Sequence, residues 1–353
     1  TWAPPTKLVG TGAVGDALQG SSVAISADGM TIISGGDGDD SFVGASWVFT
    51  YDGTNWNQQA KLIGAGGIGT SMQGWSVALS GDGNRAIVGG YDDNSGAGAA
   101  WVFERTGGTW GADGVKLIGT GVLPAEGTAI NQGISVAMSA DGKTVLIGGD
   151  YDDSGLGAGW VFTHDGTSWS QQSKLVGTGA VGTSRQAANV SLSANGNIAI
   201  LGAWGDDTNQ GATWIFSRSG TTWSQQGNKL IGTGNTGAAK QGIAVSISAD
   251  GQTLVSGGSR DNTQQGAAWV FGQSSQPVIS SATYNAALCA EFAENYGKAL
   301  EYYKKLIKIN YSKPIIYSSM ANIYRYRFLD DNPYKKIDIG TDTATVVKLI
   351  GRP

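Results

Sequence analysis

Paired aspartates recur in this chain at positions where carboxylates could bind a metal ion. In two of five similar segments a third carboxylate precedes the pair, giving the set Asp37, Asp39, Asp40, Asp150, Asp152 and Asp153. Calcium binds six to eight oxygens from carboxylates, amides and carbonyls in flexible loops. These residue types therefore predict calcium as a cofactor. The alternative is that the side chains hydrogen-bond their own backbone and only hold a turn.

The aspartates belong to a motif of about 55 residues that occurs five times. Each copy opens with K-L-[VI]-G-[TA]-G, continues through Q-x-x-x-V and S-x-[DN]-G, and closes with an aromatic strand; the copies begin at Lys7, Lys61, Lys116, Lys174 and Lys229. Self-similarity at such a period is typical of solenoids, propellers and arrays. Function must therefore be considered repeat by repeat.

Each copy is expected to contain two β-hairpins. The pair Asp28-Gly29 separates two alternating apolar runs, which predicts a hairpin with a type I′ turn. A second hairpin is expected around Asp52-Gly53, between residues 45–50 and 55–63. Four short antiparallel strands form the blade of a propeller. The sequence therefore predicts a mainly β fold, a five-bladed β-propeller.

The two ends of the repeat array favour a closed ring. The fifth copy lacks a fourth strand after Phe271, whereas Thr1-Trp2 precedes Lys7 at the spacing that separates Trp56 from Lys61. We expect the N-terminal strand to complete the fifth blade, because closure removes two exposed sheet edges.

Composition divides the chain into parts. Residues 1–276 hold 12 basic and 21 acidic residues, a net charge of −9, together with all twelve Trp. The remainder is Tyr-rich, Gly-poor and net positive. Its apolar residues recur near a helical period over residues 277–336, and residues 337–353 alternate like a strand. We expect a propeller, a small C-terminal α-helical segment and a short strand-like tail.

The repeat resembles the FG-GAP repeat of the integrin α-chain propeller in its columns V-x-[ILM]-S-x-D-G, G-G, acidic loop and G-A-x-W-V-F. This resemblance implies a β-propeller, adhesion or ligand binding, an extracellular or particle-surface setting, and often calcium. Integrin propellers have seven blades, so their ligand geometry does not transfer to five. Residues 295–310 and 314–324 resemble tetratricopeptide repeats, and Ile337 to Gly351 resembles segments of trimeric phage-like fibres.

Recurring aromatic and amide columns admit a structural or a binding role. Trp47 and its four equivalents lie in an A-x-W-V-F strand, where we expect packing between blades. A second set on the outer strand is expected to be partly exposed and comprises Trp56, Trp110, Trp169 and Trp223. Gln19 and its equivalents are expected to bond backbone between blades. Sugars stacking on Trp would instead make each blade a lectin site.

Catalysis has little support in the sequence. His164 is the only histidine and Cys289 the only cysteine, so Ser-His-Asp and Cys-His mechanisms and the usual zinc sites lack parts. The acidic propeller argues against nucleic acid as a partner, and no apolar run is long enough for a membrane span. We expect a non-enzymatic surface adhesion or protein-interaction module with a protein or assembly partner. A multivalent lectin and a structural component of a virion or fibre are the alternatives.

Overall fold

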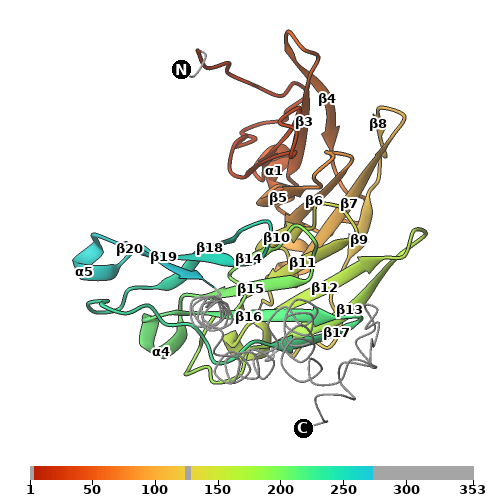
Figure 1. The fold of residues 1–353 in the computed structure, drawn as a ribbon. Helices are drawn as coiled ribbons and strands as arrows, with labels where there is room; N and C mark the ends of the chain where they lie inside the picture. The colour runs from red at the N-terminus through yellow and green to blue at the C-terminus, as the bar shows by residue number, and fades with distance from the viewer. Residues whose placement is uncertain (1–3, 124–128, 273–353) are drawn as a thin grey trace, which may run out of the picture. The chain divides into compact units, whose positions relative to one another are not determined.

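The computed structural model describes residues 4–123 and 129–272, which form five antiparallel sheets, here called blades 1 to 5 (Figure 1). In each blade the strands follow one another as neighbours in chain order, except that the outer strand of blade 2 is divided in two, so each blade is one up-and-down unit. This is the mainly β architecture predicted from the repeats and is consistent with a five-bladed propeller. The described residues contain no helix of seven residues or more. Among them, no helix is long and apolar enough to cross a membrane.

The strands have the following bounds. Blade 1 contains β1 (Val23–Ile25), β2 (Thr31–Gly36), β3 (Ala45–Tyr51) and β4 (Trp56–Leu62). Blade 2 contains β5 (Ser76–Leu79), β6 (Arg85–Gly90), β7 (Ala99–Thr106) and two short outer strands, β8 (Thr109–Trp110) and β9 (Val115–Leu117), that both pair with β7. Blade 3 contains β10 (Ser135–Met138), β11 (Thr144–Gly149), β12 (Ala158–His164) and β13 (Trp169–Leu175). Blade 4 contains β14 (Asn189–Leu192), β15 (Ile198–Ala203), β16 (Ala212–Ser219) and β17 (Thr222–Gln225). Blade 5 contains β18 (Gln241–Ile247), β19 (Thr253–Gly258) and β20 (Ala267–Gly272).

A four-residue helical segment joins the second and third strands of every blade. These segments are α1 (Asp39–Phe42), α2 (Asp93–Gly96), α3 (Asp152–Gly155), α4 (Asp206–Asn209) and α5 (Asp261–Gln264). In each, the second and third residues lie in the left-handed region, as Asp40 (φ 47°) and Ser41 (φ 56°) do in α1. Each segment is therefore a left-handed turn at the acidic loop rather than a helix.

The first strands of consecutive blades pack side by side. β1 packs against β5, β5 against β10, β10 against β14, and β14 against β18. Serine side chains at the starts of these strands form hydrogen bonds to other first strands. Ser22 Oγ accepts from Val77 N (3.1 Å), and Ser135 Oγ accepts from Val190 N (3.0 Å). The first strands thus form the inner layer, and the third and fourth strands lie outside it.

The core lies between blades. Trp101 of blade 2 is fully buried and packs in one cluster with Val48 and Leu62 of blade 1. Trp160 and Trp214 occupy the same place in the next two blades, also with no exposed surface. Packing between blades is therefore confirmed for these three of the five Trp residues in the column, whereas Trp47 packs within blade 1 and against its preceding linker, and Trp269 is half-buried.

The hairpins are confirmed, but the predicted type I′ turn is wrong. At Asp28-Gly29 only the glycine lies in the left-handed region (φ 72°), whereas a type I′ turn needs two such residues. The Asp28 carboxylate accepts hydrogen bonds from Ser26 Oγ (2.5 Å) and Met30 N (2.9 Å). These bonds keep the aspartate in an Asx-type turn with negative φ.

Closure of the ring by the N-terminal strand stays a prediction. Thr1 and Trp2 lie outside the described residues, residues 4–8 form no strand, and β20 is the edge strand of a three-stranded sheet. Val270 in β20 is 70% exposed, whereas its equivalent Val48 in β3 has no exposed surface. The predicted helical segment at 277–336 and tail at 337–353, with their tetratricopeptide and fibre resemblances, also lie outside the described residues.

Candidate functional site

A recurring pair of hydrogen bonds from a glutamine side-chain amide holds each blade to the linker that precedes it. Gly64 donates its N–H to Gln73 Oε1 (2.6 Å) and accepts from Gln73 Nε2 (3.0 Å), so one side chain satisfies a buried glycine completely. The same pairing recurs at Gln19, Gln132 and Gln186. A Cβ on Gly64 would lie 2.1 Å from the Trp101 indole, so only glycine fits. The glutamine column is thus structural, as predicted.

The first aspartate of each acidic loop is a partner of lysine. Asp39 is fully buried; its Oδ1 accepts from Val14 N (2.7 Å), and its Oδ2 lies 2.6 Å from Lys61 Nζ. Blades 2, 3 and 4 repeat the ion pair as Asp93–Lys116, Asp152–Lys174 and Asp206–Lys229. Each lysine ammonium also lies 5.3 to 5.8 Å from the centroid of the buried Trp. In Asp39 and Asp152 the carboxylate oxygen Oδ2 already forms an ion pair with a lysine ammonium group, so these two residues do not fit a calcium site.

The structure separates the other four predicted ligands. Asp40 and Asp153 are exposed, and their backbone N–H groups bond to Val14 O and Leu123 O. Asp37 is buried, and its Oδ1 has no hydrogen-bond partner among the described residues. Within the described part of the chain no three His, Cys, Asp or Glu side chains form a group that could hold a metal ion. Calcium binding at these four residues stays an untested prediction.

A central pocket opens where the first strands of all five blades begin. Its volume is about 530 Å³, and every blade contributes to its lining, through residues that include Ser22, Ser76, Ser135, Asn189 and Ile243. Trp75, Asp150 and Trp204 also line it, from the ends of the adjoining loops. Every repeat therefore contributes to one shared site, unlike the acidic loops, which are separate in each blade.

Two loop columns beside this pocket, here called its rim, differ from repeat to repeat; of their members, Asp150 and Trp204 line the pocket itself. The residue after the second strand is Asp37, Tyr91, Asp150, Trp204 and Ser259 in blades 1 to 5. The residue before the recurring Gln is Leu18, Met72, Asn131, Arg185 and Lys240. All five in the second column have positive φ, between 53° and 61°, a conformation that large side chains adopt at a cost. The rim thus carries large, dissimilar side chains on a repeated backbone.

Cationic and aromatic side chains form a cluster on the part of the rim built by blades 3, 4 and 5. The Arg185 guanidinium lies 3.3 Å from the Tyr151 ring centroid, and its Nη1 is 3.5 Å from Asp150 Oδ2. Trp204 lies 5.5 Å from that guanidinium and 4.1 Å from Lys240 Nζ. We call Asp150, Tyr151, Arg185, Trp204 and Lys240 the basic rim cluster.

Burial and like charges perturb two members of the cluster. Burial lowers the pKa of the Lys240 ammonium, and the nearby charges of Arg260 and Arg185 lower it further. Burial also raises the pKa of Asp150, against the opposing effects of hydrogen bonds from Asn131 and the charge of Arg185. The basic rim cluster thus contains two cations, Arg185 and Lys240, and one carboxylate, Asp150, and is partly shielded from water.

The opposite part of the rim is aromatic and acidic. Trp75, 39% exposed, packs edge-on against Tyr91 with ring centroids 4.7 Å apart. Burial raises the pKa of the Tyr91 hydroxyl, and the charges of Asp92 and Asp37 add to that shift. The rim thus changes from acidic over blades 1 and 2 to basic over blades 4 and 5.

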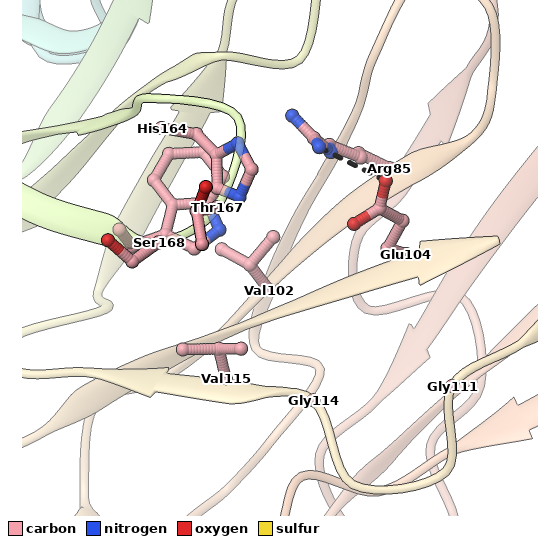
Figure 2. Close-up of a pocket in the computed structure, with 10 residues that line it drawn as sticks. Arg85, Val102, Glu104, Gly111, Gly114, Val115, His164, Thr167 and Ser168 are labelled. Carbon is pink, nitrogen blue, oxygen red and sulfur yellow. Dashed lines mark hydrogen bonds and ion pairs between the residues drawn. The ribbon is translucent and has the colours of Figure 1, made fainter. Parts of the chain in front are cut away.

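A second pocket, of about 480 Å³, lies at the outer boundary of blades 2 and 3 (Figure 2). His164, Thr167 and Ser168 line one wall; Val102, Val115 and the Arg85–Glu104 ion pair (3.1 Å) line the rest. His164 Nδ1 accepts from Gly166 N (3.1 Å), and its ring packs on Trp169. The half-buried histidine thus supports its own turn.

The outer Trp residues are mostly engaged within the protein. Trp110 is only 7% exposed, which contradicts its predicted exposure, and its Nε1 donates to Gln59 Oε1 (2.8 Å) on blade 1. Trp223 makes the same bond to Gln172 on blade 3. The predicted partial exposure holds for Trp56, Trp169 and Trp223. These contacts make the outer Trp set a poor match for equivalent sugar sites.

Comparison with known proteins identifies one repeat. The model of the FG-GAP repeat matches residues 56–103, from β4 through the third strand of blade 2. This segment is an FG-GAP repeat. The Gln73 bond, the loop of α2 and the buried Trp101 all lie within it. A search of the curated proteins finds no match.

Solved structures give weak likenesses. TolB from Acinetobacter baumannii is 14% identical with a TM-score of 0.42, over 71% of this chain and 51% of that one. Kuenenia stuttgartiensis hydrazine synthase is 11% identical with a TM-score of 0.45, over 72% and 59%. A putative TolB from Agrobacterium tumefaciens is 12% identical with a TM-score of 0.43, over 71% and 76%. The chain thus spans little more than half the length of the first two.

Proposed function

We propose that this protein is a non-enzymatic adhesion or interaction module that binds a protein partner at the rim of the central pocket. The observation that carries the proposal is the contrast between repeated and diverging positions. Glutamine, Trp and ion-pair columns recur from blade to blade, whereas the rim carries the dissimilar side chains Trp75 and Trp204, which line the pocket, and Tyr91 and Arg185, which contact them. A surface or extracellular setting is proposed with it, on the FG-GAP resemblance.

The residue types at the rim suit a protein interface. Trp, Tyr and Arg are the residues that most often dominate binding energy, especially around a central pocket. Trp75 is the most exposed Trp side chain there, and its edge-on packing against Tyr91 fixes its orientation before a partner arrives. A preorganised side chain loses little entropy on binding.

The test is selection of peptides from a displayed library on the immobilised protein, in parallel with a glycan array. We expect selected peptides to bind Trp75→Ala at least tenfold more weakly, since a hot-spot residue contributes about 2 kcal/mol or more. Trp56→Ala, on the outer strand, is the matched control and should leave binding unchanged. Saturable sugar binding that Trp56→Ala reduces only slightly would support the multivalent lectin alternative and contradict the proposal.

A further inference from the structure

Three basic side chains lie near one another beside the central pocket of an otherwise acidic propeller, and two of them contact Trp204 of its lining. Residues 1–276 carry only 12 basic residues, and Arg185, Lys240 and Arg260 are close enough to influence one another. Asp150 is the one carboxylate that forms an ion pair with a member of this group among the described residues. Such clustering of like charge is unfavourable for the folded protein alone.

The lysine of the basic rim cluster has no anionic partner within the part of the chain that the structure describes. Lys61, Lys116, Lys174 and Lys229 each form an ion pair with a buried aspartate, but no ion pair or side-chain hydrogen bond involves Lys240 among the described residues. Its ammonium instead lies over Trp204 at 4.1 Å. It is half-buried on a backbone with φ 54°. The fold therefore places this ammonium group on a strained, half-buried residue and supplies no counter-ion for it among the described residues.

The arginine is oriented for an oxyanion. The Arg185 guanidinium carbon lies 3.3 Å from the centroid of the Tyr151 ring, and Asp150 Oδ2 is 3.5 Å from Nη1, longer than a good hydrogen bond. A guanidinium that packs on an aromatic ring and makes one long ion pair has further N–H groups to donate to a second carboxylate. Arg185 and Lys240 both contact Trp204, so one acidic segment can reach both.

We infer that the basic rim cluster binds an acidic peptide segment of the partner, through carboxylates that engage Arg185 and Lys240. The inference rests on the proposed function and names the chemistry of its ligand. A peptide is favoured over an acidic sugar because the ring of Trp204 already contacts both cations and is therefore not a free platform for a sugar.

The experiment measures fluorescence anisotropy of labelled hexaglutamate with the full-length protein at low and high salt. Hexalysine and a hexameric polyuronate are the comparison probes. We expect salt-sensitive binding of hexaglutamate, weakened about tenfold by Lys240→Gln. Lys143→Gln, an equal loss of charge in the exposed β10–β11 turn, should change affinity less than twofold. The melting temperature of Lys240→Gln should stay equal or rise, because a repelled cation has been removed.

Three outcomes would overturn the inference. They are no binding of hexaglutamate, equal affinity of Lys240→Gln and Lys143→Gln for it, and tighter binding of the polyuronate. If the display selection still yields rim-dependent peptides that lack acidic residues and tolerate Lys240→Gln, only the charge assignment is wrong. If the selection yields no rim-dependent peptide at all, the proposed function is wrong.

Discussion

The buried frame between blades and the rim of the central pocket use the same backbone for opposite purposes. In the frame, each polar group meets a fixed partner: Gln73 satisfies Gly64, and Asp93 pairs with Lys116. At the rim, equivalent positions hold different side chains, and Lys240 has no counter-ion among the described residues. Repetition therefore supplies stability, and divergence on the repeated backbone supplies a candidate binding surface.

The sharpest test of this comparison replaces one Trp in each region. Trp160→Ala should lower the free energy of unfolding by about 4 kcal/mol, because a fully buried indole leaves a cavity between blades 2 and 3. Trp204→Ala should cost clearly less, because that ring is half-buried at the rim. Urea denaturation measures both. Equal losses would mean that the rim is part of the frame.

The second test breaks a buried ion pair. Lys174→Met should destabilise by about 3 kcal/mol, because Asp152, 1% exposed, keeps an uncompensated charge. The double variant with Asp152→Asn should recover part of that loss. Denaturation with calcium and with chelator should give the same values for wild type and variants if the pair is structural. A calcium-dependent gain in wild type that disappears in Asp152→Asn would restore the metal hypothesis for this loop.

Much of this frame was predictable from sequence. Hairpins, blade number and the buried Trp column follow from alternation and from columns shared by all copies. The lysine partners were missed, although Asp39 and Lys61 recur together at nearly constant spacing, because the carboxylates were read as a set of metal ligands. The rim cluster was missed for a different reason. Its residues occupy columns without a shared type, and only the fold brings Arg185, Trp204 and Lys240 to one place.

Blade 5 is where the frame is incomplete, and this allows a test of closure. Asp261 accepts a hydrogen bond from Thr236 N (2.7 Å) like its equivalents, yet no lysine pairs with it among the described residues. In the repeat the missing partner is Lys7. If the N-terminal strand closes the ring, deleting residues 1–6 should cost about 2 kcal/mol, the burial of one aromatic side chain. Lys7→Met in the full chain should also destabilise, whereas unchanged melting of both variants would leave the ring open.

The smallest expected effect lies in the Asx turns, where blade 4 provides its own control. Hydrogen bonds from Ser26 Oγ and Met30 N hold the pKa of Asp28 below its usual 3.8. A lowered folded-state pKa adds stability above the unfolded value and loses it as pH falls through the folded one. Blade 4 has Asn195 in this place, with the same bonds from Ser193 Oγ and Asn197 N.

Asp28→Asn should therefore flatten the loss of stability below pH 3.8, and Asn195→Asp should steepen it, in urea titrations from pH 2 to 7. Because neither Asp28 nor Asn195 lines the central pocket, neither change should alter hexaglutamate affinity at pH 7, and an altered affinity would contradict the separation of these turns from the rim.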